Sequence, residues 1–251
     1  MEANRPVVLT IAGFDPSGGA GILADIKTFE QHKVYGLGIN TALTLQTADK
    51  FLSICWETEN AILQSLETML ENFSISVVKI GIVENCSRLK NIVRFIHHKN
   101  NSIKIIIDPV IKSSSGFNFW NETFNKEQLA AILSFCFLIT PNYEEATQLL
   151  PAADAKIAAQ QLAQYCAVLL KGGHNNAEPG VDFLYQQQEC SSLLPIAGVV
   201  SGKHGSGCVL SAAITANIAL GDNLLTACTK AKIYIEQFLS SNNTLLGYHH
   251  V

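Results

Sequence analysis

Several features that mark special classes of protein are missing from this chain. Charged residues make up only 15% of the 251 residues and hydrophobic residues 48%, a balance that argues against a disordered chain and predicts a large buried core. The formal charge of −4 creates no positive field, so we expect neither nucleic acid nor an anionic membrane surface as a partner. No apolar run approaches the ~18 residues that a membrane-spanning helix needs.

Paired cysteines and metal-binding spacings are also missing. The seven cysteines are scattered without a C-x-x-C motif, and the N-terminal letters MEANRP form no basic leader followed by an apolar core. These two features predict reduced thiols and a cytoplasmic protein. The seven histidines lack the spacing with cysteine or acidic residues that a zinc site requires, and we expect His249 and His250 to lie in a solvated tail.

What the sequence does contain is an alternation of short β-branched runs with longer amphipathic segments. This pattern is typical of a mostly parallel sheet with crossover helices. Strands are expected at residues 7–13, 35–45, 77–83, 103–109, 137–142 and 167–174, and helices at 19–32, 60–73 and 88–98. Residues 181–198 read as a β-hairpin, and two helices follow at 205–221 and 223–239. Neither a repeat nor a linker interrupts the pattern, so one domain over residues 1–251 is expected.

Polar or small residues follow the predicted strands at their carboxyl ends. They are Gly13, Gln46, Asp108, Asn142 and Lys171. In an open parallel sheet these ends lie along one edge and form the ligand crevice. The sequence therefore predicts a site at this edge.

Two glycine-rich stretches offer competing interpretations. In GFDPSGGAGILADIKTF, residues 19–24 fit the dinucleotide fingerprint G-x-G-x-x-A, but the loop before them is long and no acid follows the next strand until Asp49, so we do not expect NAD. In SGKHGSGCVLSAA, the N–H groups around Ser206 precede a helix of small residues and predict an anion hole. Gly198, Gly202 and Lys203 approach a Walker A motif, but three residues intervene instead of four and His204 follows the lysine.

The motifs AGFDPSGGAGILADIKTF, NTALTLQT, VVKIGI, IIDPV, LITPNYEEA, LLKGGH and HGSGC occur in this order. From about Leu9 to Leu239 the chain resembles bacterial hydroxymethylpyrimidine/phosphomethylpyrimidine kinases of the ribokinase-like superfamily. The resemblance implies a three-layer α/β/α sandwich, usually a homodimer, that uses ATP and Mg²⁺. It also implies transfer of the γ-phosphoryl group to 4-amino-5-hydroxymethyl-2-methylpyrimidine, and then to its monophosphate, for thiamine biosynthesis.

The same resemblance assigns site residues by motif match. The pyrimidine pocket would be lined by Gly13, Ala20, Asp25, Gln46, Ile82 and Val110. An amide at Gln46 suits a ring nitrogen and an exocyclic amine, since it both donates and accepts. Gly205, Ser206, Gly207 and Cys208 would hold the migrating phosphoryl group through their N–H groups, with Gly207 and Asn142 also near the nucleotide. Asp108, Asn142 and Glu145 would organise Mg²⁺, and Lys171 would meet the nucleotide phosphates.

Cys208 is expected to be the catalytic base, because a helix N-terminus can lower a thiol pKa and leave thiolate at neutral pH. It could instead be a small apolar residue that packs the start of the helix. Asp15 suits a turn and Asp25 could complement a helix dipole, so either could contact the ligand or serve structure alone. Asp182 is expected to be structural.

Three positions depart from the family pattern, namely Glu84, Ser114 and Lys203. Glu84 adds a negative charge and Ser114 replaces a lysine, with Lys112 two positions away, so we expect a weaker second phosphorylation. Lys203, which stands where threonine is usual, could compensate. Two alternatives stay open: a pyridoxal kinase, which acts on a similar flat heteroaromatic alcohol, and a non-catalytic pyrimidine sensor. The phosphoryl-transfer residues argue against the sensor.

Overall fold

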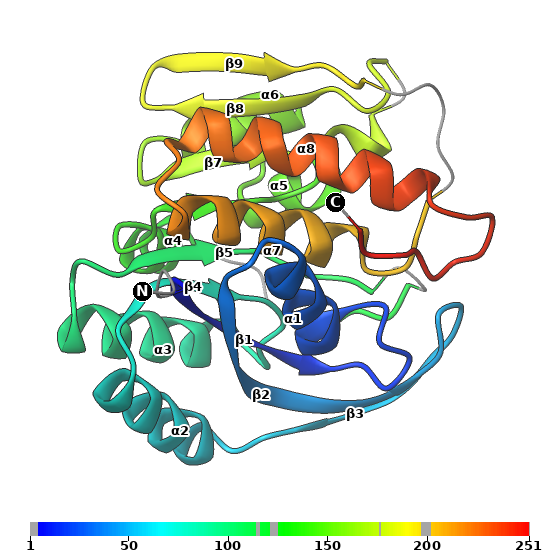
Figure 1. Cartoon of the computed structure of the whole chain (residues 1–251). Coiled ribbons are helices and arrows are strands. Elements are labelled where there is room, and N and C mark those ends of the chain that lie inside the picture. The colour runs from blue at the N-terminus through cyan, green and yellow to red at the C-terminus, as the bar shows by residue number, and fades with distance from the viewer. Residues whose placement is uncertain (1–4, 114–115, 121–124, 176, 197–201, 251) are drawn as a thin grey trace.

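The computed structural model describes residues 5–113, 116–120, 125–175, 177–196 and 202–250. Within these ranges the strands form one nine-stranded sheet in the order β3-β2-β1-β4-β5-β6-β7-β8-β9 (Figure 1). The pairs from β2 through β7 are parallel, and β3, β8 and β9 join antiparallel at the two edges. The α/β class and the mostly parallel sheet are therefore confirmed.

The predicted strands and the hairpin all form. The strands are β1 Val7–Phe14, β2 Tyr35–Gln46, β3 Phe51–Trp56, β4 Ile75–Ile80, β5 Lys104–Ile107, β6 Leu138–Ile139, β7 Ala167–Leu170, β8 Asp182–Gln186 and β9 Glu189–Leu193. The sequence analysis missed β3, because it extends the edge of the sheet and lacks the continuous apolar character of a strand buried on both faces. Gln187, in the hairpin turn, adopts a left-handed φ of 55°.

The helices are α1 Gly21–Gln31, α2 Glu59–Asn72, α3 Cys86–Lys99, α4 Lys126–Leu133, α5 Tyr143–Leu149, α6 Ala155–Leu162, α7 Ser206–Ala219 and α8 Leu224–Ser240, with a short 3₁₀ turn at Gly172–His174. The three helices α4, α5 and α6 were not predicted. Each has only seven or eight residues, so each shows barely two turns of helical periodicity.

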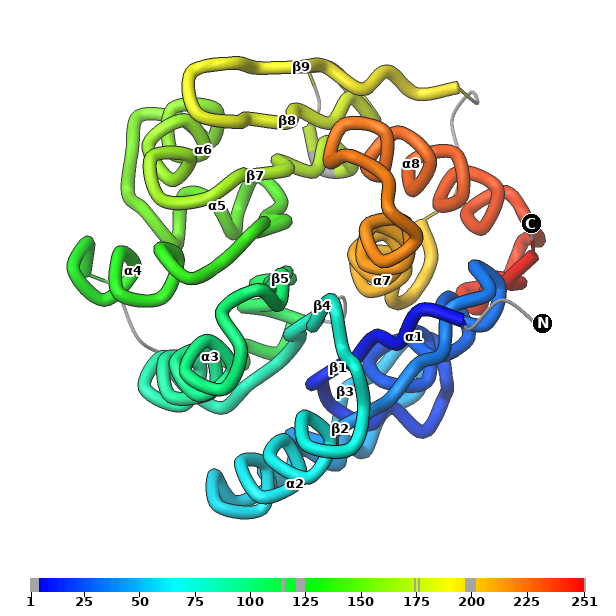
Figure 2. The backbone as a smooth tube through the Cα atoms, turned by 60° about the vertical axis from the view of Figure 1, so that its left-hand side comes forward, coloured from blue at the N-terminus to red at the C-terminus, as the bar shows by residue number. Residues whose placement is uncertain are grey.

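The sheet separates two apolar cores, and Figure 2 shows the helices on its two sides. Successive residues of a strand point to opposite faces: Ile105 and Ile107 of β5 join the core beneath α2 to α6, whereas Ile106 joins the core beneath α1, α7 and α8. Helix α7 is apolar on all sides because it lies between the sheet and α8. Three layers result, as expected. No helix of the described ranges is long and apolar enough to cross a membrane.

The expectation of a solvated tail at His249 is wrong. Its Nδ1 lies 3.1 Å from the Tyr234 hydroxyl and its ring packs on Phe238. Burial lowers the pKa of His249 to about 4, because the neutral ring is the form that an apolar environment favours. His250 is exposed, as expected.

Candidate active site

A cavity of about 1380 Å³ lies along the carboxyl edge of the parallel strands. Among the residues that line it are the predicted site residues Gly13, Ala20, Gln46, Ile82, Asp108, Val110, Asn142, Glu145, Lys171, Gly205, Ser206, Gly207 and Cys208. The five strand-exit residues thus meet in one place. Asp25 is the one predicted site residue that does not line the cavity.

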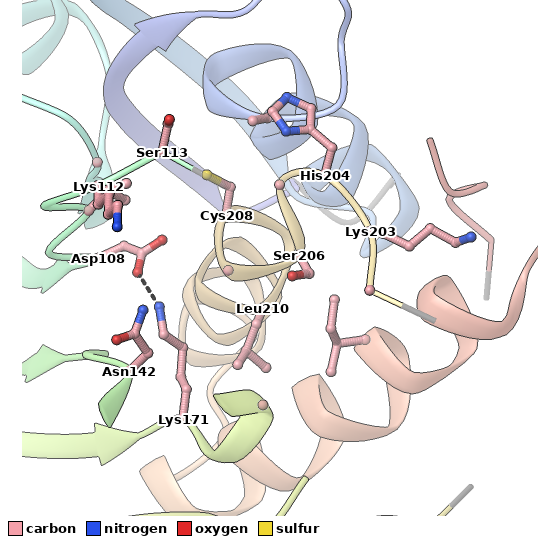
Figure 3. Close-up of a pocket in the computed structure, with 18 of the residues that line it drawn as sticks. Asp108, Lys112, Ser113, Asn142, Lys171, Lys203, His204, Ser206, Cys208 and Leu210 are labelled. Atoms are coloured by element: carbon pink, nitrogen blue, oxygen red, sulfur yellow. Dashed lines mark hydrogen bonds and ion pairs between the residues drawn. The ribbon is translucent and has the colours of Figure 1, made fainter. Parts of the chain in front are cut away.

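The anion-hole loop, residues 203–208, enters the cavity at the start of α7 (Figure 3). Gly205 is the N-cap with a left-handed φ of 73°, and no side chain caps the helix there. The Ser206 N–H donates to the Lys203 carbonyl at 3.3 Å, whereas the first-turn N–H groups of Gly207 and Cys208 have no carbonyl of their own helix to meet. These groups can therefore receive an anion, and the positive end of α7 favours one.

Lys171 stands opposite the anion-hole loop and joins two carboxylates. Its Nζ donates to Asp108 Oδ1 at 2.8 Å and lies 3.7 Å from Glu145 Oε2 (Figure 3). A Cβ atom on Gly207 would lie 3.3 Å from this Nζ, so glycine at this position lets the ammonium approach the loop closely. Burial would lower the pKa of Lys171, but the Asp108 and Glu145 carboxylates outweigh burial and raise it.

The pKa values of the Asp108 and Glu145 carboxylates are shifted in opposite directions. Burial acts to raise the pKa of Asp108, but Lys171 and Lys79 outweigh it and lower that pKa. Asp108 also accepts hydrogen bonds from Thr140 and Ser211. For Glu145, burial dominates: despite the attraction of Lys171, its pKa rises to about 7, with repulsion from Asp108 adding to the shift. Asp108 and Glu145 thus place two carboxyl groups close together, with the Lys171 ammonium beside both.

Asn142 has a structural task that the sequence analysis did not foresee. It caps α5: its side-chain oxygen accepts from the Glu145 N–H at 2.8 Å, and Glu145 Oε2 accepts from the Asn142 N–H at 2.7 Å. This reciprocal capping box fixes where Glu145 points. Asn142 therefore acts in this structure through Glu145, because its amide oxygen is already engaged with the helix.

The expectation of a lowered pKa at Cys208 is wrong. Burial raises the pKa of this thiol to about 11, and the attraction of Lys79 is opposed by the repulsion of Asp25 and Asp108. The helix N-terminus does not compensate for the lost hydration of a thiolate. The Gly21 N–H is directed at the sulfur and favours the thiolate slightly, so the thiol faces the glycine loop, residues 13–21.

The glycine loop and the anion-hole loop are joined by a buried His–Asp pair. His204 Nε2 lies 2.8 Å from Asp15 Oδ2, and both side chains are almost fully buried. Asp15 also accepts from the N–H groups of Ser17 and Ala20. A Cβ atom on Gly205 would lie 1.9 Å from the Gly19 carbonyl oxygen, so the two loops are in backbone contact. Asp15 is therefore the junction between them.

Asp25 lies beneath this site in a closed ion pair. Its carboxylate accepts from Lys79 Nζ at 2.6 Å and from the Thr10 hydroxyl at 2.6 Å, with both charged side chains fully buried. Burial would lower the pKa of Lys79, but the Asp25 carboxylate outweighs it and raises it. The structure thus separates Asp25 from the cavity wall. The missed signal was Lys79, a lysine within an apolar strand, which needs a buried acidic partner.

The expected acceptor end of the cavity is walled by apolar and amide groups. Gln46 Nε2 donates to the Thr44 hydroxyl at 2.9 Å, which orients its amide. The sequence analysis missed Phe119, which lines this end and packs edge-on against Phe51 with ring centroids 5.3 Å apart. Its position depends on β3, which brings the Phe51 ring against it. Lys112 also lines this end, and the predicted departure at Ser114 lies outside the described residues.

Glu84 and Lys203 make contacts that the sequence analysis did not predict. Glu84 pairs with Arg88 at 2.6 Å and is not among the cavity residues. Lys203 does line the cavity, but its ammonium donates to oxygens of Asn242 and Thr244, and Figure 3 shows its side chain directed away from Asp108 and Lys171. The Lys203 ammonium is thus bound to the C-terminal residues and not directed toward the expected acceptor end. Gly198 of the rejected Walker A motif lies outside the described residues.

The opposite end of the cavity lies between the β8 region and α8. Asp182 accepts from the Gly172 N–H at 2.7 Å and from Lys232 at 2.9 Å, and Lys232 also donates to the Gly180 carbonyl. These contacts agree with the structural role expected for Asp182. The sequence analysis missed Lys232, whose position on the buried side of an amphipathic helix was the available signal.

Comparison with known proteins agrees with this geometry. The sequence profile of the family described as phosphomethylpyrimidine kinase matches residues 15–251. A hydroxymethylpyrimidine/phosphomethylpyrimidine kinase of Aquifex aeolicus is 34% identical over 95% of this chain and 96% of its own.

Solved structures show the same fold. A phosphomethylpyrimidine kinase from Clostridium difficile has a TM-score of 0.77 at 32% identity and covers 93% of this chain and 99% of its own. A pyridoxal kinase from Staphylococcus aureus in complex with ADP has a TM-score of 0.82 at 27% identity, over 97% of this chain and 91% of its own. The profile match and the identity to the Aquifex protein place this chain in the phosphomethylpyrimidine kinase family.

Proposed function

We propose that this protein transfers the γ-phosphoryl group of ATP to the hydroxymethyl group of 4-amino-5-hydroxymethyl-2-methylpyrimidine, and then to the monophosphate, in thiamine biosynthesis. The observation that carries the proposal is the meeting, in one cavity, of the anion-hole loop, Lys171, Asp108 and Cys208 with the amide of Gln46. Phosphoryl transfer is catalysed mainly by positioning and by charge stabilisation, and this cavity supplies both.

The phosphates would lie between the anion-hole loop and Lys171. The N–H groups of Gly207 and Cys208 donate to the migrating phosphoryl group, and the Lys171 ammonium neutralises charge as it moves toward the acceptor oxygen. Opposed donors on two sides hold the phosphorus in line between the leaving and attacking oxygens. Gln46, held by Thr44, orients the pyrimidine so that its hydroxyl points into this line.

Mg²⁺ suits the carboxylates of Asp108 and Glu145. Among the described residues no group of three or more His, Cys, Asp or Glu forms a metal site, but in kinase sites Mg²⁺ is commonly held by one or two carboxylates together with substrate phosphates and water. The elevated pKa of Glu145, caused by burial and by Asp108, shows negative charge that a divalent cation would relieve. Bound there, the ion would neutralise charge on the phosphates.

Cys208 remains our proposed proton acceptor, because its thiol faces the glycine loop at the head of the cavity. With a pKa of about 11, roughly one thiol in 10⁴ is ionised at pH 7. The acceptor hydroxyl would therefore lose its proton late in the phosphoryl transfer. The turnover number should then rise with pH, by up to about tenfold per pH unit below the thiol pKa. A flat profile between pH 7 and 9 would remove the thiolate from the mechanism.

The test is ATP consumption by the purified protein with Mg²⁺ and, in separate reactions, hydroxymethylpyrimidine, its monophosphate and pyridoxal. Cys208→Ala should lower the turnover number about 10²- to 10⁴-fold. Cys228→Ala is the matched control, since Cys228 is also a helical cysteine and lies outside the cavity lining. Turnover of the pyrimidine that survives in Cys208→Ala would leave the substrate assignment standing and exclude the base.

Pyridoxal is a second candidate acceptor. The specific support is the similarity to the Staphylococcus aureus pyridoxal kinase, whose TM-score of 0.82 exceeds the 0.77 of the Clostridium enzyme. Gln46 favours the aminopyrimidine, because an amide can pair with both its ring nitrogen and its amine. Turnover of pyridoxal alone would assign the protein to vitamin B6 salvage, and no turnover of any acceptor would favour the sensor.

We also propose that the chain acts as one domain in a cytoplasmic homodimer. The seven free cysteines agree with a reducing compartment. Large apolar side chains are exposed on β2 and on the neighbouring β3, with Leu43 at 52%, Leu45 at 58% and Leu52 at 63%, and such a face can be buried by a second copy. Size-exclusion chromatography with light scattering measures the molar mass of the protein in solution and so tests the dimer. Leu45→Lys should shift the equilibrium toward the monomer.

A further inference from the structure

Lys203 carries a buried ammonium group that points away from the phosphoryl site. The residue is 5% exposed, and its Nζ donates to the carbonyl oxygens of Asn242 and Thr244, each at 2.6 Å, and to the Asn242 side-chain oxygen at 3.1 Å. An ammonium has three N–H donors, so these oxygens can satisfy all of them. All three acceptors are neutral and belong to the chain that follows α8.

This C-terminal segment, residues 241–250, is held by its own hydrogen bonds around a turn at Asn242. The Asn242 side-chain oxygen also accepts from the Thr244 N–H, and the Asn242 amide group donates to the Leu246 carbonyl. Further along, the Tyr248 N–H donates to the Ser241 hydroxyl. Asn242 therefore stabilises this segment through hydrogen bonds within it, and Lys203 adds hydrogen bonds from the anion-hole loop.

The same segment contacts both loops of the candidate active site. The Leu245 carbonyl accepts from the His204 N–H at 2.9 Å, within the anion-hole loop. The Leu246 side chain packs on the glycine loop, since its Cδ2 lies 2.6 Å from where a Cβ atom on Gly19 would be. Leu245 also lines the cavity. The C-terminal segment thus backs the place where the two loops meet.

We propose that Lys203 is a positioning residue, which holds the anion-hole loop in place by binding the C-terminal segment. The main chain of Lys203 also shapes the anion-hole loop, because its carbonyl accepts from the Ser206 N–H, just before the N–H groups of Gly207 and Cys208. The inference rests on the proposed function, since those donors are the ones assigned to the phosphoryl group. The Lys203 ammonium itself contacts no substrate.

This role predicts a defect in transfer and not in acceptor binding. If the loop shifts by a fraction of an ångström, the phosphoryl group is held off line, and misplacement of this size can cost up to ~100-fold in rate. Gln46 and Val110 lie at the acceptor end, on other elements. Lys203→Met should therefore lower kcat roughly tenfold or more while the KM for the pyrimidine changes less than about twofold.

Lys203 could alternatively bind a phosphate directly. A substitution at its partner Asn242 distinguishes this role from the positioning role. Asn242→Ala leaves Lys203 intact but removes one of its acceptors and the centre of the turn. A positioning role predicts that Asn242→Ala lowers kcat in the same direction as Lys203→Met, and that the two changes together are less than additive. A phosphate ligand predicts that Asn242→Ala leaves kcat unchanged and that Lys203→Met raises the KM for ATP.

The experiment compares kcat and both KM values for the wild type, Lys203→Met, Lys203→Arg, Asn242→Ala and Lys230→Met. Arginine keeps a multi-donor cation and should recover part of the lost kcat. Lys230 is the control, because it lies exposed on α8 and pairs with Asp222, just before that helix, at 2.8 Å. Amide hydrogen exchange over residues 203–209 and 242–248 is measured on each variant and should accelerate in both segments for Lys203→Met and Asn242→Ala.

Exchange that stays at the wild-type rate in either segment of Lys203→Met would overturn the inference, as would an unchanged kcat in that variant. A wild-type protein that phosphorylates none of the acceptors would instead remove the proposed function. In that case the exchange rates still decide whether Lys203 joins the two segments.

Discussion

Two buried lysine–carboxylate pairs lie near the centre of this sheet, and only one of them faces the cavity. Lys79 and Asp25 approach to 2.6 Å and both side chains are 0% exposed. Lys171 and Asp108 approach to 2.8 Å, but the lysine is 13% exposed and has Glu145 as a second neighbour. The first pair is fully enclosed by the protein, whereas the second lines the cavity beside the anion-hole loop.

The difference follows from where each lysine lies along its strand. Lys79 is inside β4, where side chains point into a closed core, and its ammonium donates to both carboxylate oxygens of Asp25, which also accepts from the Thr10 hydroxyl. Lys171 comes one residue after β7, at the edge where parallel strands open onto a crevice. The same chemistry is therefore structural in the interior of a strand and available to a ligand at its carboxyl end.

The largest effect is expected from breaking the closed pair. Lys79→Met leaves the Asp25 carboxylate buried without its cation, and such changes cost about 3 to 5 kcal/mol of unfolding free energy. Urea denaturation measures the loss. Lys79→Met combined with Asp25→Leu should recover most of it, because no charge is then stranded. A single variant as stable as the wild type would show that Asp25 holds its own proton.

Breaking the open pair should affect activity instead. Lys171→Met leaves Asp108 with Thr140, Ser211 and access to the cavity, so the unfolding free energy should change by less than about 2 kcal/mol. Steady-state kinetics should show kcat/KM lowered about 10²- to 10³-fold, because a charge-stabilising donor is lost. Lys99→Met, at an exposed ion pair, is the control. Full activity of Lys171→Met would remove this lysine from the mechanism.

The His204–Asp15 junction should give an intermediate, pH-dependent effect. Although burial opposes it, hydrogen bonds from His204 and Ser17 lower the Asp15 pKa from its ordinary 3.8. A lowered pKa contributes stability that is present above 3.8 and is lost as pH falls through the lower folded-state value. Asp15→Asn should cost about 1 to 3 kcal/mol at pH 7, and its difference from the wild type should shrink in acid. A pH-independent difference would contradict the assignment.

The smallest effect is expected at Glu84. It forms a partly exposed ion pair with Arg88, away from the cavity lining, and such pairs contribute about 0 to 1 kcal/mol. Glu84→Gln should leave the ratio of turnover for the free alcohol and its monophosphate within about twofold of the wild type. A marked gain in the second phosphorylation would restore the original expectation for this residue.

The sequence predicts the cavity edge well because the edge depends on local order. Asp108, Asn142 and Lys171 each follow a short apolar run, and the carboxyl ends of parallel strands converge whatever the loops do. The helix start at Gly205 is likewise readable from small residues before an apolar segment. These features need no knowledge of long-range contacts.

What the sequence analysis missed in the site depends on partners distant in the chain. Asp25 reads as a ligand or a dipole residue until Lys79, 54 positions away, is seen beside it. The pKa of Cys208 depends on how deeply α7 is buried, which periodicity does not reveal. Phe119 and Lys203 acquire their roles from β3 and from residues 242–244, and neither contact has a local signature.

The contact between Gly19 and Gly205 also constrains how the enzyme could be redesigned. A Cβ atom at position 205 would lie 1.9 Å from the Gly19 carbonyl oxygen, so the backbones of the glycine loop and the anion-hole loop are in direct contact. Changing the glycine loop to admit a bulkier alcohol would move the transfer machinery with it. Variants with a new acceptor range should therefore be selected with both loops randomised together, since neither can be optimised while the other is held fixed.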